Sequence, residues 1–148
     1  MDEKISENLL TAWLRVSAGV RNERLVRTMT FNEVFVCNIL YAETVLADKA
    51  VTATDICERT GMLKSQANKV LVAMEDAGLI VRERSEADRR KVILRLTDEG
   101  VRRYINEHSS VLKIMQMLTD RLGSTKISLV SALLTEVADT INIISKEI

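Results

Sequence analysis

Residues 52–97 read TATDICERTGMLKSQANKVLVAMEDAGLIVRERSEADRRKVILRLT, and several local patterns follow one another along them. The first part has a helical periodicity that Gly61 interrupts and Gly78 ends. After Gly78 the apolar residues form β-rich runs on both sides of a polar stretch. These patterns predict helices at about 52–60 and 64–77 and strands at about 79–84 and 91–96. This is the order of a winged helix-turn-helix, in which the second helix enters the DNA major groove.

The helix expected at 64–77 has one apolar and one polar face. Its inward positions are Ala67, Val70, Leu71 and Met74, and its outward positions near the N-terminus are Lys64, Ser65, Gln66, Asn68 and Lys69. Gln and Asn pair with adenine through two hydrogen bonds, Lys reaches guanine or phosphate, and Ser at a helix start suits a phosphate oxygen. Polar residues on a helix are usually only solvated surface. Their place at the start of the second helix of this motif favours contact with DNA.

The polar stretch 85–91 is the expected tip of a wing. It holds three consecutive cations at 89–91, and narrow minor grooves attract inserted arginine side chains. Glu86 and Asp88 weaken the electrostatic case for DNA binding, and a solvated charged turn is the alternative interpretation. Alternatively, a bidentate ion pair between Asp88 and Arg90 would present that arginine to DNA rather than cancel its charge. The candidate DNA contacts outside the helix at 64–77 are Thr54, Arg82, Arg84, Asp88, Arg89 and Arg90.

Two helical segments precede this motif. The apolar positions of the first segment are Ile5, Leu9, Trp13, Val16 and Val20. They share one face of a helix expected at about 3–27. Thr30 and Glu33 have the spacing of a capping box, which predicts a second helix from there to about Ala47. That second helix is apolar nearly all round and is expected to be the most buried.

Two long segments with apolar residues at spacings of three and four follow the motif. The first carries Val101, Tyr104, His108, Val111, Met115, Leu118 and Leu122, and the second carries Ile127, Val130, Leu134, Val137, Ile141, Ile144 and Ile148. A turn at 122–125 separates the two expected helices. We interpret His108 as a packed or interface residue rather than a ligand or base. Rows this apolar require partners, so we expect a dimer.

The composition bounds the fold class. The chain has 148 residues, of which 47% are hydrophobic and 3% aromatic, with five Gly and no Pro. Such a chain suits one mainly helical domain. The formal net charge is zero, so the overall basic excess typical of nucleic-acid-binding proteins is absent. Between residues 61 and 95 there are eight Lys or Arg against five Asp or Glu, so the case for DNA depends on local placement.

Other classes of protein lack their signatures in the sequence. No signal-peptide pattern follows Met1, and no uncharged apolar run approaches the about 18 residues of a membrane span. We therefore expect a soluble, cytoplasmic protein. We identify no Gly-rich phosphate loop, metal-ligand cluster or nucleophile elbow, which argues against an enzyme, a cofactor and a metal site.

The two cysteines have a spacing that matches neither a zinc site nor a disulfide framework. Cys37 lies among apolar residues, so we expect an inert, buried thiol with a raised pKa. Cys57 has more polar neighbours and is the better candidate for oxidation, although packing is the commoner role for both.

Several short motifs stand at intervals usual for one group of bacterial regulators. They are Asp88-x-Arg90, Leu96-Thr97-Asp98-Glu99-Gly100, Ala53-Thr54-Asp55-Ile56, Lys64-Ser65 and Gly78-Leu79-Ile80. Through these motifs and the lengths of the flanking helices, nearly the whole chain resembles the MarR family. The resemblance implies a dimer whose first and last helices interlock, with recognition helices in successive major grooves and Arg90 in the minor groove. It also implies release by a small amphipathic effector or by cysteine oxidation.

We therefore expect a single domain, 1–148, that is mainly α with a small β-hairpin wing. A winged helix-turn-helix core at 30–99 is joined to a helical dimerisation region built from 1–29 and 100–148. The expected function is that of a sequence-specific transcriptional regulator, a repressor that binds an inverted repeat in double-stranded DNA as a homodimer and that a small molecule releases.

The sequence alone leaves two alternative functions open. A winged-helix module that binds protein instead of DNA suits the neutral net charge. A redox-sensing regulator would use a cysteine. Trp13 is the candidate effector contact, although a tryptophan on a helix face more often lies in a core or an interface.

Overall fold

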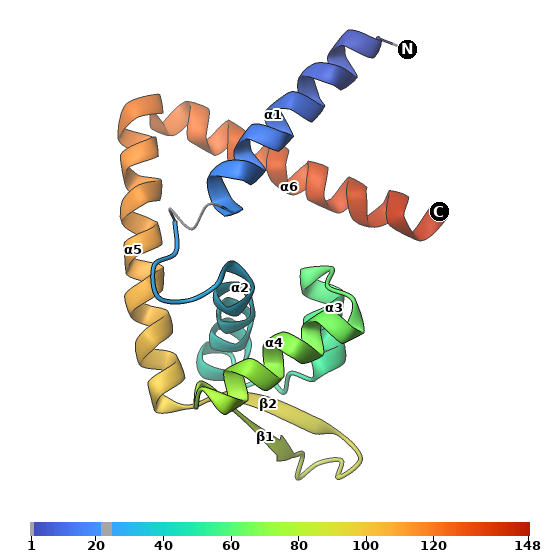
Figure 1. Cartoon of the computed structure of the whole chain (residues 1–148), viewed down its shortest axis with the longest axis vertical. Helices are drawn as coiled ribbons and strands as arrows, with labels where there is room; N and C mark the ends of the chain where they lie inside the picture. Colours follow the sequence, from blue (N-terminus) through green and yellow to red (C-terminus); the bar gives the residue numbers. More distant parts are fainter. Residues whose placement is uncertain (1, 22–24) are drawn as a thin grey trace. The chain divides into compact units, whose positions relative to one another are not determined.

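The computed structural model describes residues 2–21 and 25–148 as helices with one two-stranded hairpin (Figure 1). The elements are α1 (Glu3–Arg21), α2 (Phe31–Leu40), the π-helix η1 (Tyr41–Leu46), α3 (Ala53–Thr60), α4 (Lys64–Asp76), β1 (Ile80–Arg84), β2 (Val92–Leu96), α5 (Asp98–Leu122) and α6 (Ser124–Glu147). The chain forms two compact units, Met1–Ser110 and Val111–Ile148, and the division falls within α5. The predicted fold class, mainly α with a β-hairpin, is confirmed.

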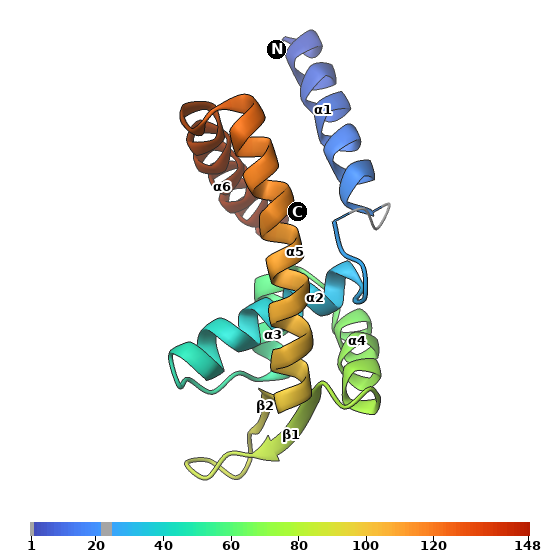
Figure 2. The same cartoon turned by 90° about the vertical axis from the view of Figure 1, so that its left-hand side faces the viewer.

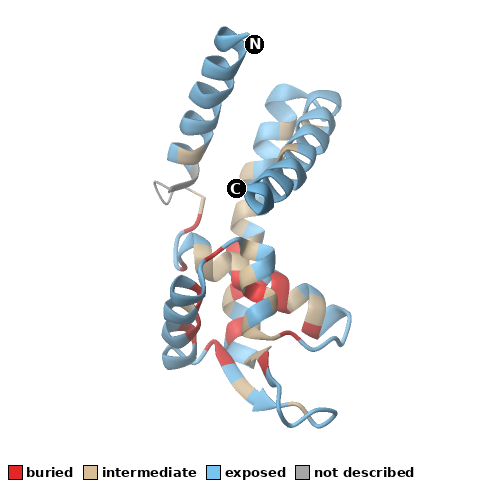
Figure 3. Cartoon of the chain, turned by 90° about the vertical axis from the view of Figure 1, so that its right-hand side faces the viewer, coloured by how far each residue is buried: buried red, intermediate tan, exposed pale blue. Residues whose placement is uncertain are grey.

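The core of the first unit gathers around α2. Its largest fully buried side chains come from α2, α3, α4 and the hairpin, and they include Val36, Leu40, Ile56, Leu71, Met74 and Leu94 (Figure 3). The prediction that the helix following Thr30 is the most buried is consistent with four buried residues among the ten of α2. Of the inward positions predicted for α4, Ala67, Leu71 and Met74 are buried and Val70 is half-buried. Burial of this apolar area is what fixes α4 on the other helices.

Local signals place the ends of these helices. Thr30 caps α2 by a capping box with Glu33, with N–H to oxygen distances of 3.2 and 2.9 Å. Thr52 caps α3 in the same way with Asp55. Gly61 ends α3 at a φ of 71°, a left-handed conformation that glycine adopts without a Cβ penalty.

The hairpin is antiparallel and joins the core through β2. Its register runs from Ile80 opposite Leu96 to Arg84 opposite Val92. The Leu94 N–H donates to the Val51 carbonyl at 2.8 Å, which ties β2 to the residues that precede α3. Figures 1 and 2 both show the far end of the hairpin projecting beyond α2, α3 and α4, as a wing does.

Two predicted helices differ from the structure. The helix predicted at 3–27 is too long, because α1 ends at Arg21 and residues 25–30 are not helical. The reason is distant in sequence: the Glu107 carboxylate accepts the amides of Arg27 and Thr28, and Thr30 then caps the next helix. The side chain of Val20 lies outside the described side chains.

The helix predicted at 30–47 is α-helical only to Leu40 and continues as η1. The Thr44 hydroxyl donates to the Leu40 carbonyl at 2.6 Å and competes there with the regular backbone bond.

The rows of apolar residues predicted in the long helices are largely exposed in the single chain. In α1, Ile5, Leu9, Trp13 and Val16 are exposed, and no residue of α6 is buried. By length and composition alone, α6 is long and apolar enough to cross a membrane. From the sequence no membrane span was expected, because no apolar run of that length is free of charged residues. The apolar stretch of α6 contains Glu136 and Asp139. Since an Asp costs about 2.5–3.5 kcal/mol at the centre of a membrane helix, these acids favour a protein partner for α6.

Candidate nucleic-acid interface

The polar face of α4 is exposed to solvent at its N-terminal end, where contacts with DNA bases are expected. Its five predicted DNA contacts, Lys64, Ser65, Gln66, Asn68 and Lys69, are all exposed. Ala67 stands among them and is 1% exposed, so it fixes the helix on the core while its neighbours face outward. The acids Glu75 and Asp76 lie at the opposite end of α4, as the sequence indicated. The structure thus brings one cluster of hydrogen-bonding and cationic side chains to the N-terminal half of α4.

A hollow lies between the first turn of α3 and the part of the hairpin where the strands meet the wing tip. It has a volume of about 500 Å³, and its lining includes Thr52, Thr54, Ser85, Lys91 and Val92. Thr54, a predicted contact, is exposed there. Lys91 is one of the three cations at the wing tip, but it was not among the predicted DNA contacts. The local sequence around Lys91 could not show that it lies beside α3, because the hollow brings together residues almost 40 positions apart.

The wing tip is held by backbone contacts. Asp88 Oδ1 accepts the backbone N–H of Arg90 at 3.0 Å, and the Lys91 N–H donates to the Asp88 carbonyl at 2.9 Å. The prediction of a bidentate ion pair between Asp88 and the Arg90 guanidinium is therefore wrong. The carboxylate shapes the turn, as Asp side chains do in tight turns. Among residues 2–21 and 25–148, no ion pair engages the Arg90 guanidinium, and the side chain is exposed.

The other arginines of the hairpin have different surroundings. Arg84 donates to the Arg89 carbonyl at 3.0 Å and so braces the tip, and both side chains are exposed. Arg82 instead lies half-buried, with its Nε 3.6 Å from a Glu75 carboxylate oxygen of α4. Arg82 is therefore separated from the wing tip and connects β1 to the C-terminal end of α4.

The cysteines differ in burial, and both are free thiols. Burial, with a smaller contribution from the Glu33 carboxylate, raises the pKa of Cys37 to about 12. The predicted buried thiol with a raised pKa is confirmed, and at neutral pH it holds almost no thiolate to react with oxidants. Cys57 is half-buried in α3.

The only histidine of the sequence packs as expected. The Tyr104 hydroxyl lies 3.2 Å from His108 Nδ1 and accepts a hydrogen bond from the Asn38 amide at 2.8 Å. Burial raises the pKa of Tyr104, although the Asn38 bond acts in the opposite direction. Trp13 on α1 is 47% exposed, and its role as an effector contact stays a prediction. Within the described ranges, no cluster of three metal-ligating side chains occurs.

Comparisons with known proteins all find transcriptional regulators. The model of the MarR family matches residues 43–91, from η1 to the wing. The HTH-type transcriptional regulator FarR of Neisseria gonorrhoeae is 32% identical over 84 residues, which make up 57% of this chain. The matched part spans 58% of the length of FarR.

Solved structures match over more of the chain. The transcriptional repressor CouR bound to a 23-mer DNA duplex is 27% identical, with a TM-score of 0.75 over 93% of this chain and 97% of CouR. The PcaV regulator of Streptomyces coelicolor in complex with its natural ligand is 24% identical, with a TM-score of 0.72 over 94% and 96% of the two chains, a likeness that shows the fold alone. Through its match to the family model over residues 43–91 and its winged-helix fold, the chain is similar to transcriptional regulators of the MarR family.

Proposed function

We propose that this chain is a homodimeric, sequence-specific DNA-binding regulator, a cytoplasmic repressor that a small amphipathic effector releases from an inverted repeat. The observation that carries the proposal is the N-terminal half of α4. Exposed amide, hydroxyl and ammonium groups surround the buried Ala67 there, in the helix that enters the major groove in this motif. CouR, the DNA-bound relative at 27% identity, supports the same use of the fold.

The wing supplies a second kind of contact. Arg89 and Arg90 are exposed at its tip, and the turn that carries them is fixed by Asp88 and Ser85. A preorganised turn loses little conformational entropy when it binds. An arginine there suits the minor groove, where groove width and negative potential are read. We assign the minor groove to the wing and base recognition to α4.

A second copy of the chain is the proposed partner of the exposed apolar helices. The apolar rows of α1 and α6 exceed what a soluble monomer exposes. A two-fold dimer covers them and presents two copies of α4 to one duplex. With recognition helices about one DNA turn apart, about 34 Å, the half-site centres lie about 10 base pairs apart.

The proposed signal is a small molecule rather than an oxidant. PcaV with its natural ligand and NadR in complex with 4-hydroxyphenylacetate share this fold. The high pKa of the Cys37 thiol argues against that residue as a redox sensor. The neutral net charge is the one observation that favours a protein-binding module instead, and the following experiments separate it from DNA binding.

Replacing Asn68 by Ala is expected to remove base-specific affinity. On the duplex that the wild-type protein enriches from a random-sequence library, the variant loses about 1–3 kcal/mol per half-site, because a bidentate pair with one base is gone. On a random duplex its affinity stays at the wild-type value. Fluorescence anisotropy on both duplexes measures this, and Asn106→Ala, an exposed residue of α5, is the control. Equal losses on both duplexes would show that Asn68 does not read a base.

Replacing Arg90 by Ala is expected to weaken binding to all duplexes and to reduce its salt dependence. The slope of log affinity against log salt flattens by about one unit for each wing, because each lost phosphate neutralisation releases about one counterion fewer. Titrations at four salt concentrations measure the slope. Arg102→Ala removes the same charge from α5, where Arg102 pairs with Glu99, and should leave the slope unchanged. A wild-type slope for Arg90→Ala would exclude the wing from the interface.

A further inference from the structure

Leu63 stands directly before the recognition helix and is strongly exposed. It occupies the N-cap of α4, and 74% of its surface is accessible. Its neighbour Met62 is only 8% exposed and belongs to the core. The exposed leucine therefore lies at the end of α4 that carries Lys64, Ser65 and Gln66.

Leucine is a poor residue for this position. An N-cap side chain normally accepts one of the free amides of the first turn, and Ser, Thr, Asp and Asn do so while Leu does not. The backbone of Leu63 has the usual cap geometry, φ −64° and ψ 150°, yet no side-chain cap bond is formed. The two preceding helices, α2 and α3, both use a threonine in a complete capping box. Leu63 thus weakens the helix that it starts, which indicates a use other than folding.

The side chain is directed outward by the residues on either side. Met62 at the position before the cap and Ala67 in the fourth helical position are both buried in the same core, the arrangement of a hydrophobic staple. The Ala67 N–H also donates to the Leu63 carbonyl at 2.9 Å. Met62 and Ala67 thus occupy the core on either side of Leu63, whose own side chain stays exposed.

We propose that Leu63 recognises thymine by packing on its 5-methyl group in the major groove. The inference rests on the DNA-binding function proposed above. The start of the recognition helix is the part that meets base edges. The thymine methyl is the apolar group among the base edges of that groove, and apolar side chains are its partners. Leu63 therefore contributes a third, apolar contact beside the hydrogen-bonding residues of α4.

Deoxyuridine, which lacks only the 5-methyl group, is the direct probe. In the duplex that the wild-type protein enriches from a random library, each thymine is replaced in turn by deoxyuridine. One position per half-site should weaken wild-type binding about three- to fivefold, the effect of one buried methyl group. Leu63→Ser should show no such loss at that position. Its melting temperature should rise by about 2–4 °C, because the serine supplies the missing cap.

Other outcomes are distinguishable. If no deoxyuridine position weakens the wild-type protein, or if Leu63→Ser keeps the same loss, Leu63 does not read thymine, while the DNA-binding function stands. If the wild-type protein enriches no duplex from the library, the proposed function itself fails and this inference with it. The wild-type arm needs no variant, so the test does not depend on how Leu63→Ser folds.

Discussion

Replacing Gly100 by Ala is expected to lower the free energy of unfolding by about 3 kcal/mol or more. A Cβ at this position would overlap the Leu79 carbonyl oxygen and lie 3.2 Å from Leu96 Cδ2. The Leu79 oxygen has little freedom to move, since it accepts the Thr97 N–H at 3.0 Å. Overpacking against fixed backbone is among the costliest single changes.

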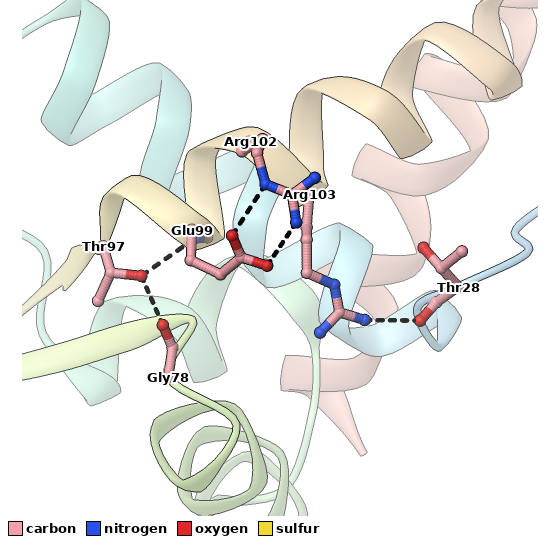
Figure 4. A network of polar contacts seen from close by, with 7 residues as sticks. Thr28, Gly78, Thr97, Glu99, Arg102 and Arg103 are labelled. Carbon is pink, nitrogen blue, oxygen red and sulfur yellow. Dashed lines mark hydrogen bonds and ion pairs between the residues drawn. The ribbon is translucent and has the colours of Figure 1, made fainter.

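The contacts around Gly100 explain why α5 starts so close to the hairpin. The Thr97 hydroxyl donates to the Gly78 carbonyl at 2.6 Å and accepts the Gly100 N–H at 3.0 Å (Figure 4). One side chain thus caps α5 and holds it against the turn that follows α4.

The sign of the effect is informative, because helix propensity predicts the opposite. In a free helix, Gly→Ala stabilises by about 1 kcal/mol. Gly19 of α1 provides the control, since a Cβ there would have no atom within 4 Å. Urea denaturation should therefore show Gly19→Ala unchanged or stabilised and Gly100→Ala strongly destabilised. A neutral Gly100→Ala would contradict the close approach of α5 to Leu79.

Replacing Glu107 by Gln is expected to lower the free energy of unfolding by about 2–3 kcal/mol at pH 7. The Glu107 side chain is 3% exposed. Its carboxylate accepts the Thr28 hydroxyl at 2.6 Å, the Thr28 amide at 3.0 Å and the Arg27 amide. Arg103 donates to the Thr28 carbonyl at 2.9 Å, which completes the attachment of this segment to α5 (Figure 4). A Gln NH₂ directed at these donors leaves buried groups unsatisfied.

The contribution of Glu107 to the free energy of unfolding should decrease at low pH. Burial raises the pKa of Glu107, but the bonds from the Thr28 hydroxyl and the amides of Arg27 and Thr28 outweigh it, and the net pKa is lowered. The stabilisation is therefore complete above the unfolded value, about 4.3, and is lost as the pH falls through the folded pKa.

Chemical denaturation between pH 7 and pH 3 measures the difference between wild type and Glu107→Gln. That difference should shrink below about pH 4.3. Glu58→Gln, on the exposed side of α3, should match the wild type throughout. A difference that stays constant with pH would mean that the carboxylate charge does not hold this segment.

Features encoded within a few residues were predictable from the sequence. The capping box of Thr30, the glycine stops and the β-rich runs each depend on neighbours, and the start of α2, both ends of α3 and α4, and the hairpin follow these signals closely. The exposed cluster on α4 was predictable for the same reason, since helical periodicity fixes which residues share a face. The cap at Leu63 also has a local signal, an apolar residue where a polar one is usual.

Features that depend on distant residues were not predictable. The end of α1 and the extended segment after it involve Glu107, which is 80 residues from Arg27. The hollow lined by Thr54 and Lys91 likewise joins remote positions. At the wing tip the error had another cause: charge alone suggested an ion pair between Asp88 and Arg90, whereas turn geometry offered the backbone N–H instead.

The central claim is that two copies of the chain bind one inverted repeat. Sedimentation of the protein with the duplex enriched from a random library, at several salt concentrations, tests it most directly. We expect the free protein at twice 16.7 kDa and two chains per duplex. The enriched sequence should be an inverted repeat with half-site centres about 10 base pairs apart, and binding should weaken steeply with salt. A monomer at micromolar concentration, or equal affinity for enriched and random duplexes, would contradict the account.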